Sequence, residues 1–65
     1  MKDVTLLLTP REKEVMEHLS RGLSYKEIAH RMDVSHETVK MHLKNIYRKL
    51  RVQNKIEALM RLRIV

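Results

Sequence analysis

Signals for the start of a helix recur along this chain and constrain its fold more than any other feature. At Thr9, Ser24 and Asn54, a residue suited to capping a helix is followed three positions later by Glu, which is the capping-box pattern. Ser35 is a further residue of the type that caps a helix N-terminus. Four such starts in a chain of 65 residues predict an all-α fold.

The segments after these starts have helical periodicity, and the single Pro and single Gly mark helix ends. Pro10 suits the first position of a helix, and Gly22 suits a left-handed residue after the last turn. In the third segment, apolar residues recur at steps of four, three and four, at Val39, Leu43, Ile46 and Leu50. The chain 1–65 is expected to form one four-helix domain, with helices at about 10–21, 25–32, 36–50 and 54–63.

The composition argues against several classes of protein. With no cysteine, the chain has neither disulfides nor thiolate metal sites. No apolar run is long enough to cross a membrane, and two tyrosines are too few for a surface on which single-stranded nucleic acid stacks. A domain of this size buries only about 60% of its unfolded surface, so an enclosed catalytic pocket is not expected. We predict no enzymatic activity and no cofactor.

The four histidines do not form a metal-binding pattern. His36 and His42 lie about 120° apart around one predicted helix. No pair of histidines has the spacing His-x-x-x-His that places two imidazoles on one helix face. We therefore predict no metal site.

Basic charge is concentrated in the second part of the chain. Residues 1–37 contain six basic and seven acidic side chains, whereas residues 38–65 contain eight basic side chains and one acid, Glu57. The net charge of +6 therefore comes from the C-terminal part and indicates a polyanionic partner. The alternative is a solvated basic face that serves only solubility.

Two short helices joined by a tight turn, the second with a basic outer face, predict a helix-turn-helix. In that unit the second helix enters the major groove of double-stranded DNA. Lys40 and Lys44 lie one turn apart and can reach phosphates or base edges, and Met41 between them can contact a thymine methyl group. Glu37 either accepts a hydrogen bond from cytosine or only stabilises the first helical turn.

The expected DNA contacts fall into two groups. Base edges would be read by Lys40, Met41, Lys44, Glu37 and Asn45. The DNA backbone would be bound from helix N-termini and from the outer face of the third helix, by Ser24, Lys26, Thr38 and Arg48.

The last predicted helix is apolar on nearly every side, which a surface helix on a small core should not be. Ile56, Met60 and Arg63 share one stripe, and Ala58 and Leu62 share another. One stripe is expected in the core and the other on a partner surface. We favour Ile56, Met60 and Arg63 as the surface of a weak homodimer.

The sequence resembles the LuxR/FixJ/GerE family of bacterial DNA-binding domains. The resemblance rests on residues 8–12, 22–29, 35–42, 49–50 and 52. It implies dimerisation through the fourth helix on inverted-repeat DNA sites. It also implies that Lys40, Met41 and Lys44 face the major groove, and that the residues close to backbone phosphates are Ser24, Lys26, Ser35, Thr38 and Val39.

The function expected from the resemblance is sequence-specific DNA binding by a cytoplasmic bacterial transcription regulator. Members of the family are typically output domains of two-component response regulators or quorum-sensing receptors, which implies an N-terminal regulatory domain absent from this chain. One alternative is a small regulator that acts alone. A less favoured alternative is a module that uses its basic amphipathic helices to bind a membrane surface or a protein.

The sequence departs from the family pattern at three positions. Tyr25 stands where Asn is usual, and Lys55 replaces a common Arg. Arg51 stands where Gly is frequent. If the backbone at Arg51 is left-handed, the side chain costs roughly 1 kcal/mol, which a phosphate contact would offset.

Overall fold

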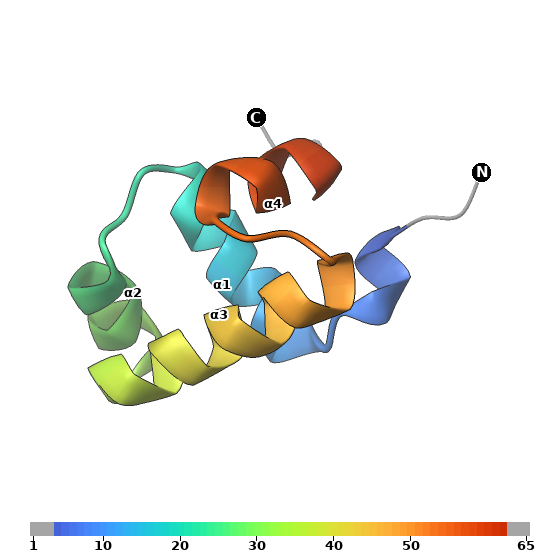
Figure 1. Ribbon diagram of the computed structural model, residues 1–65. Coiled ribbons are helices and arrows are strands. Elements are labelled where there is room, and N and C mark those ends of the chain that lie inside the picture. Colours follow the sequence, from blue (N-terminus) through green and yellow to red (C-terminus); the bar gives the residue numbers. More distant parts are fainter. Residues whose placement is uncertain (1–3, 63–65) are drawn as a thin grey trace.

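Five helical elements make up the part of the chain that the computed structural model describes, residues 4–62 (Figure 1). They are the 3-10 helix η1 (Val4–Leu7) and the α-helices α1 (Pro10–Ser20), α2 (Tyr25–Met32), α3 (His36–Leu50) and α4 (Lys55–Leu62). No strand occurs in this range. The all-α fold with a helix-turn-helix is confirmed. α1, α2 and α3 begin and end within one residue of the expected positions, and α4 begins one residue later than expected, while its expected end at residue 63 lies outside the described residues.

α3 lies at the centre of the packing, because α1, α2, α4 and η1 all contact it. In Figure 1 it runs along the lower edge of the molecule, with α2 beside its N-terminal end and α4 above. Its predicted apolar stripe is buried, and the largest fully buried side chains of the molecule are Met16, Ile28, Ile46, Leu50, Val15 and Val39. Burial of one stripe fixes α3 and leaves its opposite face to solvent.

Side-chain caps fix where α1, α2 and α3 begin. The Thr9 hydroxyl accepts from the Glu12 N–H at 3.1 Å, and the Glu12 carboxylate accepts from the Thr9 N–H at 2.9 Å. Ser24 and Glu27 form the same reciprocal pair at 3.2 and 2.9 Å. Ser35 caps α3 by accepting from the third helical N–H. Each cap satisfies a backbone donor that the helix leaves unpaired.

The start of α4 differs from the predicted capping box. The Asn54 side chain accepts from the Glu57 N–H at 2.9 Å, as expected. The Glu57 carboxylate, however, accepts from the N–H of Gln53 at 2.8 Å, one residue before the cap. The Glu57 carboxylate therefore reaches one residue further back than in a capping box.

The same kind of turn ends α1, α2 and α3. Each helix is followed by a residue with left-handed backbone. Asp33 (φ 55°) and Arg51 (φ 57°) come directly after α2 and α3, and Gly22 (φ 85°) is the second residue after α1. The next residue is apolar, packs against the core and donates its N–H to a carbonyl five positions back, in the pairs Leu23–His18, Val34–Ala29 and Val52–Tyr47. This is the Schellman turn, and it directs the chain from each helix into the core.

An ion pair joins the start of α1 to the end of α3. Lys49 Nζ lies 2.7 Å from Glu12 Oε1, and the Glu12 side chain is only 5% exposed. Burial raises the pKa of Glu12, but the hydrogen bonds from Lys49 and Thr9 outweigh it and hold this pKa below its ordinary value. Glu12, which completes the capping box of α1, thus also positions the end of α3 through Lys49.

η1 is the element that the sequence did not predict. It has no capping residue that marks its start, and its four residues are too few for a periodic pattern. It contacts both α3 and α4. Leu8, just after it, is buried, whereas Leu6 and Leu7 are exposed.

Candidate nucleic-acid interface

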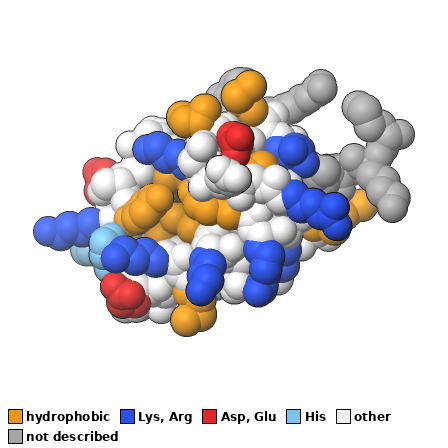
Figure 2. Space-filling model, in the orientation of Figure 1, with side chains coloured by type: hydrophobic (Ala, Val, Ile, Leu, Met, Phe, Trp, Pro, Cys, Tyr) orange, Lys and Arg blue, Asp and Glu red, His pale blue; other side chains and the backbone are white. Residues whose placement is uncertain are grey.

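The outer face of α3 carries most of the residues that were predicted to read DNA. Lys40, Met41, Lys44 and Glu37 are all exposed, and so is Arg48. Figure 2 shows Lys and Arg side chains side by side along the lower edge of the molecule, over α3. Met41 is 63% exposed between the lysines, so its apolar surface is free for contact.

Two contacts within α3 arrange this face. Lys40 Nζ lies 3.6 Å from Glu37 Oε1, and both side chains are largely exposed. An exposed pair of this kind contributes at most about 1 kcal/mol, so DNA phosphate can displace Glu37 from Lys40. Arg48 donates to Asn45 Oδ1 at 3.0 Å, and Asn45 is half-buried. This hydrogen bond leaves the Asn45 amide nitrogen and one lone pair of Oδ1 for the predicted contact with a base.

The N-termini of α2 and α3 offer unpaired backbone donors. Within residues 4–62, no acceptor is found for the N–H groups of Tyr25 and Lys26 in α2, or of His36 and Glu37 in α3. Positive helix-dipole ends and free N–H groups favour an anion. The Ser35 and Thr38 hydroxyls lie 2.8 Å apart and share one hydrogen bond. A hydroxyl proton of this pair remains free to bond phosphate.

Val39 does not contact the solvent. Its side chain is fully buried, and its N–H donates to the Ser35 carbonyl at 3.2 Å. Val39 packs the N-terminal part of α3 against the core, so neither its side chain nor its N–H is free to bind an anion. The nearness of Val39 to a phosphate that the resemblance implies stays a prediction.

Aromatic side chains lie where α2 meets α3, and of these the sequence analysis did not single out Tyr47. The rings of Tyr25 and His36 lie 6.1 Å apart, which brings the N-termini of the two helices together. The Tyr47 hydroxyl is buried and has no hydrogen-bond partner among the described residues. Burial and the neighbouring Tyr25 phenol raise the pKa of Tyr47. Its sequence signal is weak, because Tyr47 lies beside the apolar stripe rather than within it.

The two stripes of α4 face opposite environments. Ala58 and Leu62 are buried in the core, whereas Ile56 is 58% and Met60 71% exposed. The exposed stripe is the one predicted to form a dimer. Arg63, its third predicted member, lies outside the described residues.

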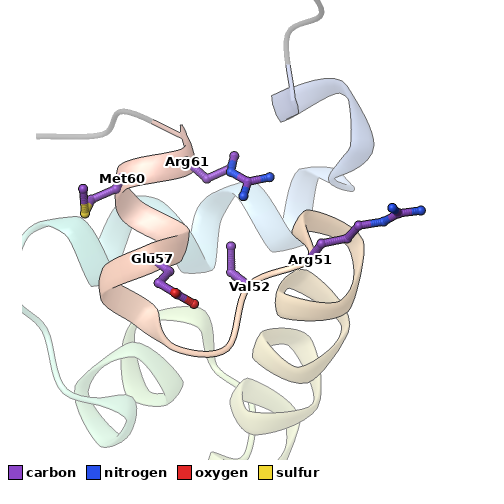
Figure 3. A pocket seen from close by; sticks show the side chains of 5 residues that line it. All are labelled: Arg51, Val52, Glu57, Met60 and Arg61. Carbon is purple, nitrogen blue, oxygen red and sulfur yellow. The ribbon is translucent and has the colours of Figure 1, made fainter.

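A shallow hollow lies where the end of α3 meets α4 (Figure 3). It is lined by Arg51, Val52, Glu57, Met60 and Arg61. Arg61 Nη1 donates to the Leu50 carbonyl at 3.0 Å and so caps the end of α3. In Figure 3 the Arg51 side chain points away from Glu57 and toward solvent.

Neither a metal-binding group nor a membrane-spanning helix is found within the described residues. Residues 4–62 contain no group of three His, Asp or Glu side chains arranged to hold a metal ion. None of the helices described has the length and apolar character needed to cross a membrane.

These features define a helix-turn-helix module of the kind that binds DNA, with α3 as the outward-facing helix. A comparison with protein families agrees, because residues 6–62 match the GerE model, described as bacterial regulatory proteins of the luxR family. The chain therefore belongs to the luxR family of DNA-binding transcription regulators. The resemblance drawn from the sequence is confirmed.

The chain is similar to parts of bacterial regulators that are longer than it is. The chain is 39% identical over 51 residues to the nitrate/nitrite response regulator protein NarL of Escherichia coli K12, an alignment that covers 78% of this chain and 24% of NarL. It is 42% identical over 57 residues to NarP of the same organism, covering 88% of this chain and 26% of NarP. The probable regulator GfsR of Streptomyces halstedii is 44% identical over 57 residues, covering 88% and 24%. The chain thus spans about a quarter of these relatives.

Proposed function

We propose that residues 1–65 form one domain that binds specific double-stranded DNA sites and regulates transcription in the bacterial cytoplasm, without enzymatic activity. The observation that carries the proposal is the exposed face of α3, where Lys40, Lys44 and Arg48 project from a helix whose other face is fixed in the core. A helix held in this way fits the major groove of duplex DNA.

The side chains proposed to contact DNA fall into one group that reads base edges and another that binds the backbone. Lys40, Lys44 and Met41 lie on the exposed face of α3 and would contact base edges, while Glu37 would accept from cytosine once Lys40 turns to the DNA. The backbone would be held by Arg48, by exposed Lys26 and by the helix N-termini capped by Ser24 and Ser35, with Thr38 beside Ser35. Phosphate contacts supply affinity and base contacts supply specificity.

A homodimer on inverted-repeat DNA is supported by α4. Ile56 and Met60 are large apolar side chains on one exposed stripe, while the opposite stripe is packed in the core. Two copies would bury these stripes against each other; Arg63, the third residue predicted for this surface, lies outside the described residues. The patch is small, so the dimer would be weak in solution and favoured by binding to adjacent half-sites.

The chain is proposed to act as the effector domain of a two-component response regulator. Two relatives are named response regulators, and the chain aligns with only about a quarter of each. An N-terminal regulatory domain would supply the signal. The alternative, a small regulator that acts alone, uses the same DNA-binding surface.

The test is selection of bound sites from a pool of randomised duplex DNA at near-physiological salt. The proposal expects enrichment of an inverted repeat, with half-sites about one helical turn apart or closer. Salt-sensitive binding without enrichment would remove sequence specificity from this domain. Binding to anionic lipid vesicles but not to DNA would replace the proposal with the membrane alternative.

A further inference from the structure

Arg51 is the least expected of the three left-handed residues that end helices. Gly22 has no Cβ and adopts a left-handed backbone without strain. Asp, the type of residue at position 33, is one of the few others that adopt this backbone. Arg belongs to neither group, yet its φ is 57° and its ψ 48°. Gly would form the same turn without strain. The presence of Arg at this position therefore calls for a role of its side chain. Strained backbone of this kind clusters at ligand-binding positions.

The Arg51 side chain has no acidic partner among residues 4–62. No carboxylate in residues 4–62 lies within 4.0 Å of its guanidinium, whereas Arg11 and Arg21 each pair with a nearby Glu. It is exposed and points away from the only acidic side chain lining the hollow beside it, Glu57 (Figure 3). The guanidinium is therefore available to an anion from outside the chain.

Arg51 extends the basic row of α3. Lys40, Lys44, Arg48 and Arg51 are spaced by four, four and three residues, which keeps their Cα atoms on one side of the helix axis. At a rise of 1.5 Å per residue, Arg51 lies about 16 Å along the axis from Lys40. The major groove is only about 12 Å wide. A helix that crosses the groove with Lys40 at the bases therefore brings its C-terminal end to the sugar–phosphate wall.

We propose that Arg51 binds a backbone phosphate of the DNA at the far end of α3, and that this contact offsets the strain of an Arg in the left-handed conformation. The inference rests on the proposed function. Arg is suited to the task, because its planar guanidinium donates two parallel hydrogen bonds to phosphate oxygens. The contact adds affinity without base specificity.

The test measures stability and DNA affinity for the same variants of the full chain. Arg51→Gly removes the backbone strain and should raise the melting temperature by roughly 4–8 °C. Both Arg51→Gly and Arg51→Ala should weaken binding to a selected duplex severalfold and lower the slope of log K against log salt by about 0.9 per protomer. Arg51→Lys keeps the charge and should retain most of the slope.

Arg21→Ala is the matched control. Arg21 is also the residue that ends a helix, but its φ is −88° and it pairs with Glu17 at 3.1 Å. α1 ends at the top of the molecule in Figure 1, opposite the basic row of α3. The salt slope of this variant should equal that of the wild type.

Three results would overturn the inference. Equal salt slopes for the wild type and Arg51→Ala would show that no phosphate is bound. A change in dimer affinity with an unchanged salt slope would assign Arg51 to the hollow and to a second copy of the chain. A wild-type chain that binds no duplex at any salt concentration would overturn the proposed function together with the inference.

Discussion

At the residue scale, Lys40 is the side chain whose role is most sharply testable. It is exposed on the outer face of α3 and held only by a weak ion pair with Glu37. We expect Lys40→Ala to cost about 1–3 kcal/mol of binding free energy and to relax preference at one base position. Quantitative binding to the selected site and to its single-base variants measures both effects.

Lys55→Ala is the control for Lys40→Ala, because it removes one positive charge at a position away from the outer face of α3. Lys55 begins α4, which lies above α3 in Figure 1, so its removal should leave preference at every base position unchanged. If Lys40→Ala instead weakens binding equally on all duplexes, Lys40 binds phosphate and the base-reading assignment is wrong.

Tyr47 gives a prediction about stability. Its buried hydroxyl has no partner among the described residues, and an unsatisfied buried hydroxyl costs about 1–3 kcal/mol. Tyr47→Phe removes the hydroxyl and keeps the ring, so the free energy of unfolding should rise by about 1 kcal/mol in urea denaturation. Tyr25→Phe removes the neighbouring phenol, and because the Tyr47 hydroxyl is unpaired this variant should change stability little. A loss of stability in Tyr47→Phe would show that the Tyr25 phenol or a water molecule satisfies the hydroxyl.

At the element scale, the helices and their caps could be predicted from the sequence, because a cap is made by residues three positions apart. Thr9, Ser24 and Ser35 are examples. Contacts between elements could not be predicted in the same way. Glu12 and Lys49 are 37 residues apart, and nothing in the local pattern of either residue identifies its partner.

The pair of Glu12 and Lys49 makes stability depend on pH. The pKa of Glu12 in the folded protein lies below 4.5, so the folded state takes up this proton less readily than the unfolded state. The stabilisation is thus complete above about pH 4.5 and is lost as the pH falls through the folded pKa. We expect Glu12→Gln to lose about 1–2 kcal/mol at neutral pH, a value discounted because Lys49 is one-third exposed.

Urea denaturation between neutral pH and about pH 3 measures this effect. Gln can still complete a capping box, so the substitution isolates the ion pair. Stability of Glu12→Gln should fall less between about pH 5 and pH 3 than that of the wild type. Lys49→Met leaves the carboxylate buried without its cation, which raises the pKa of Glu12 in the folded protein, so the stability of this variant should also fall less between about pH 5 and pH 3 than that of the wild type. An acid-induced loss in Glu12→Gln equal to that of the wild type would contradict the assignment.

At the scale of the whole molecule, the division into a basic face and an apolar face follows from periodicity. The sequence assigned the exposed basic face of α3 correctly because one stripe of that helix is strongly apolar. For α4, periodicity separated two apolar stripes but did not decide which one is buried. The packing of α4 against α1, α3 and η1 makes that choice, and it leaves Met60 in solvent.

The exposure of Met60 leads to a prediction about assembly. A carboxylate there places two like charges across any interface formed by the exposed stripe of α4, and it touches nothing in the core. Met60→Glu should therefore keep the helical circular dichroism and melting temperature of the wild type but bind an inverted-repeat duplex as single protomers. Sedimentation on that duplex distinguishes one protomer from two. Lys55→Glu, on the same helix but outside the stripe, should still bind as a pair. If Met60→Glu also binds as a pair, the dimer uses another surface and the assignment of Ile56 and Met60 is wrong.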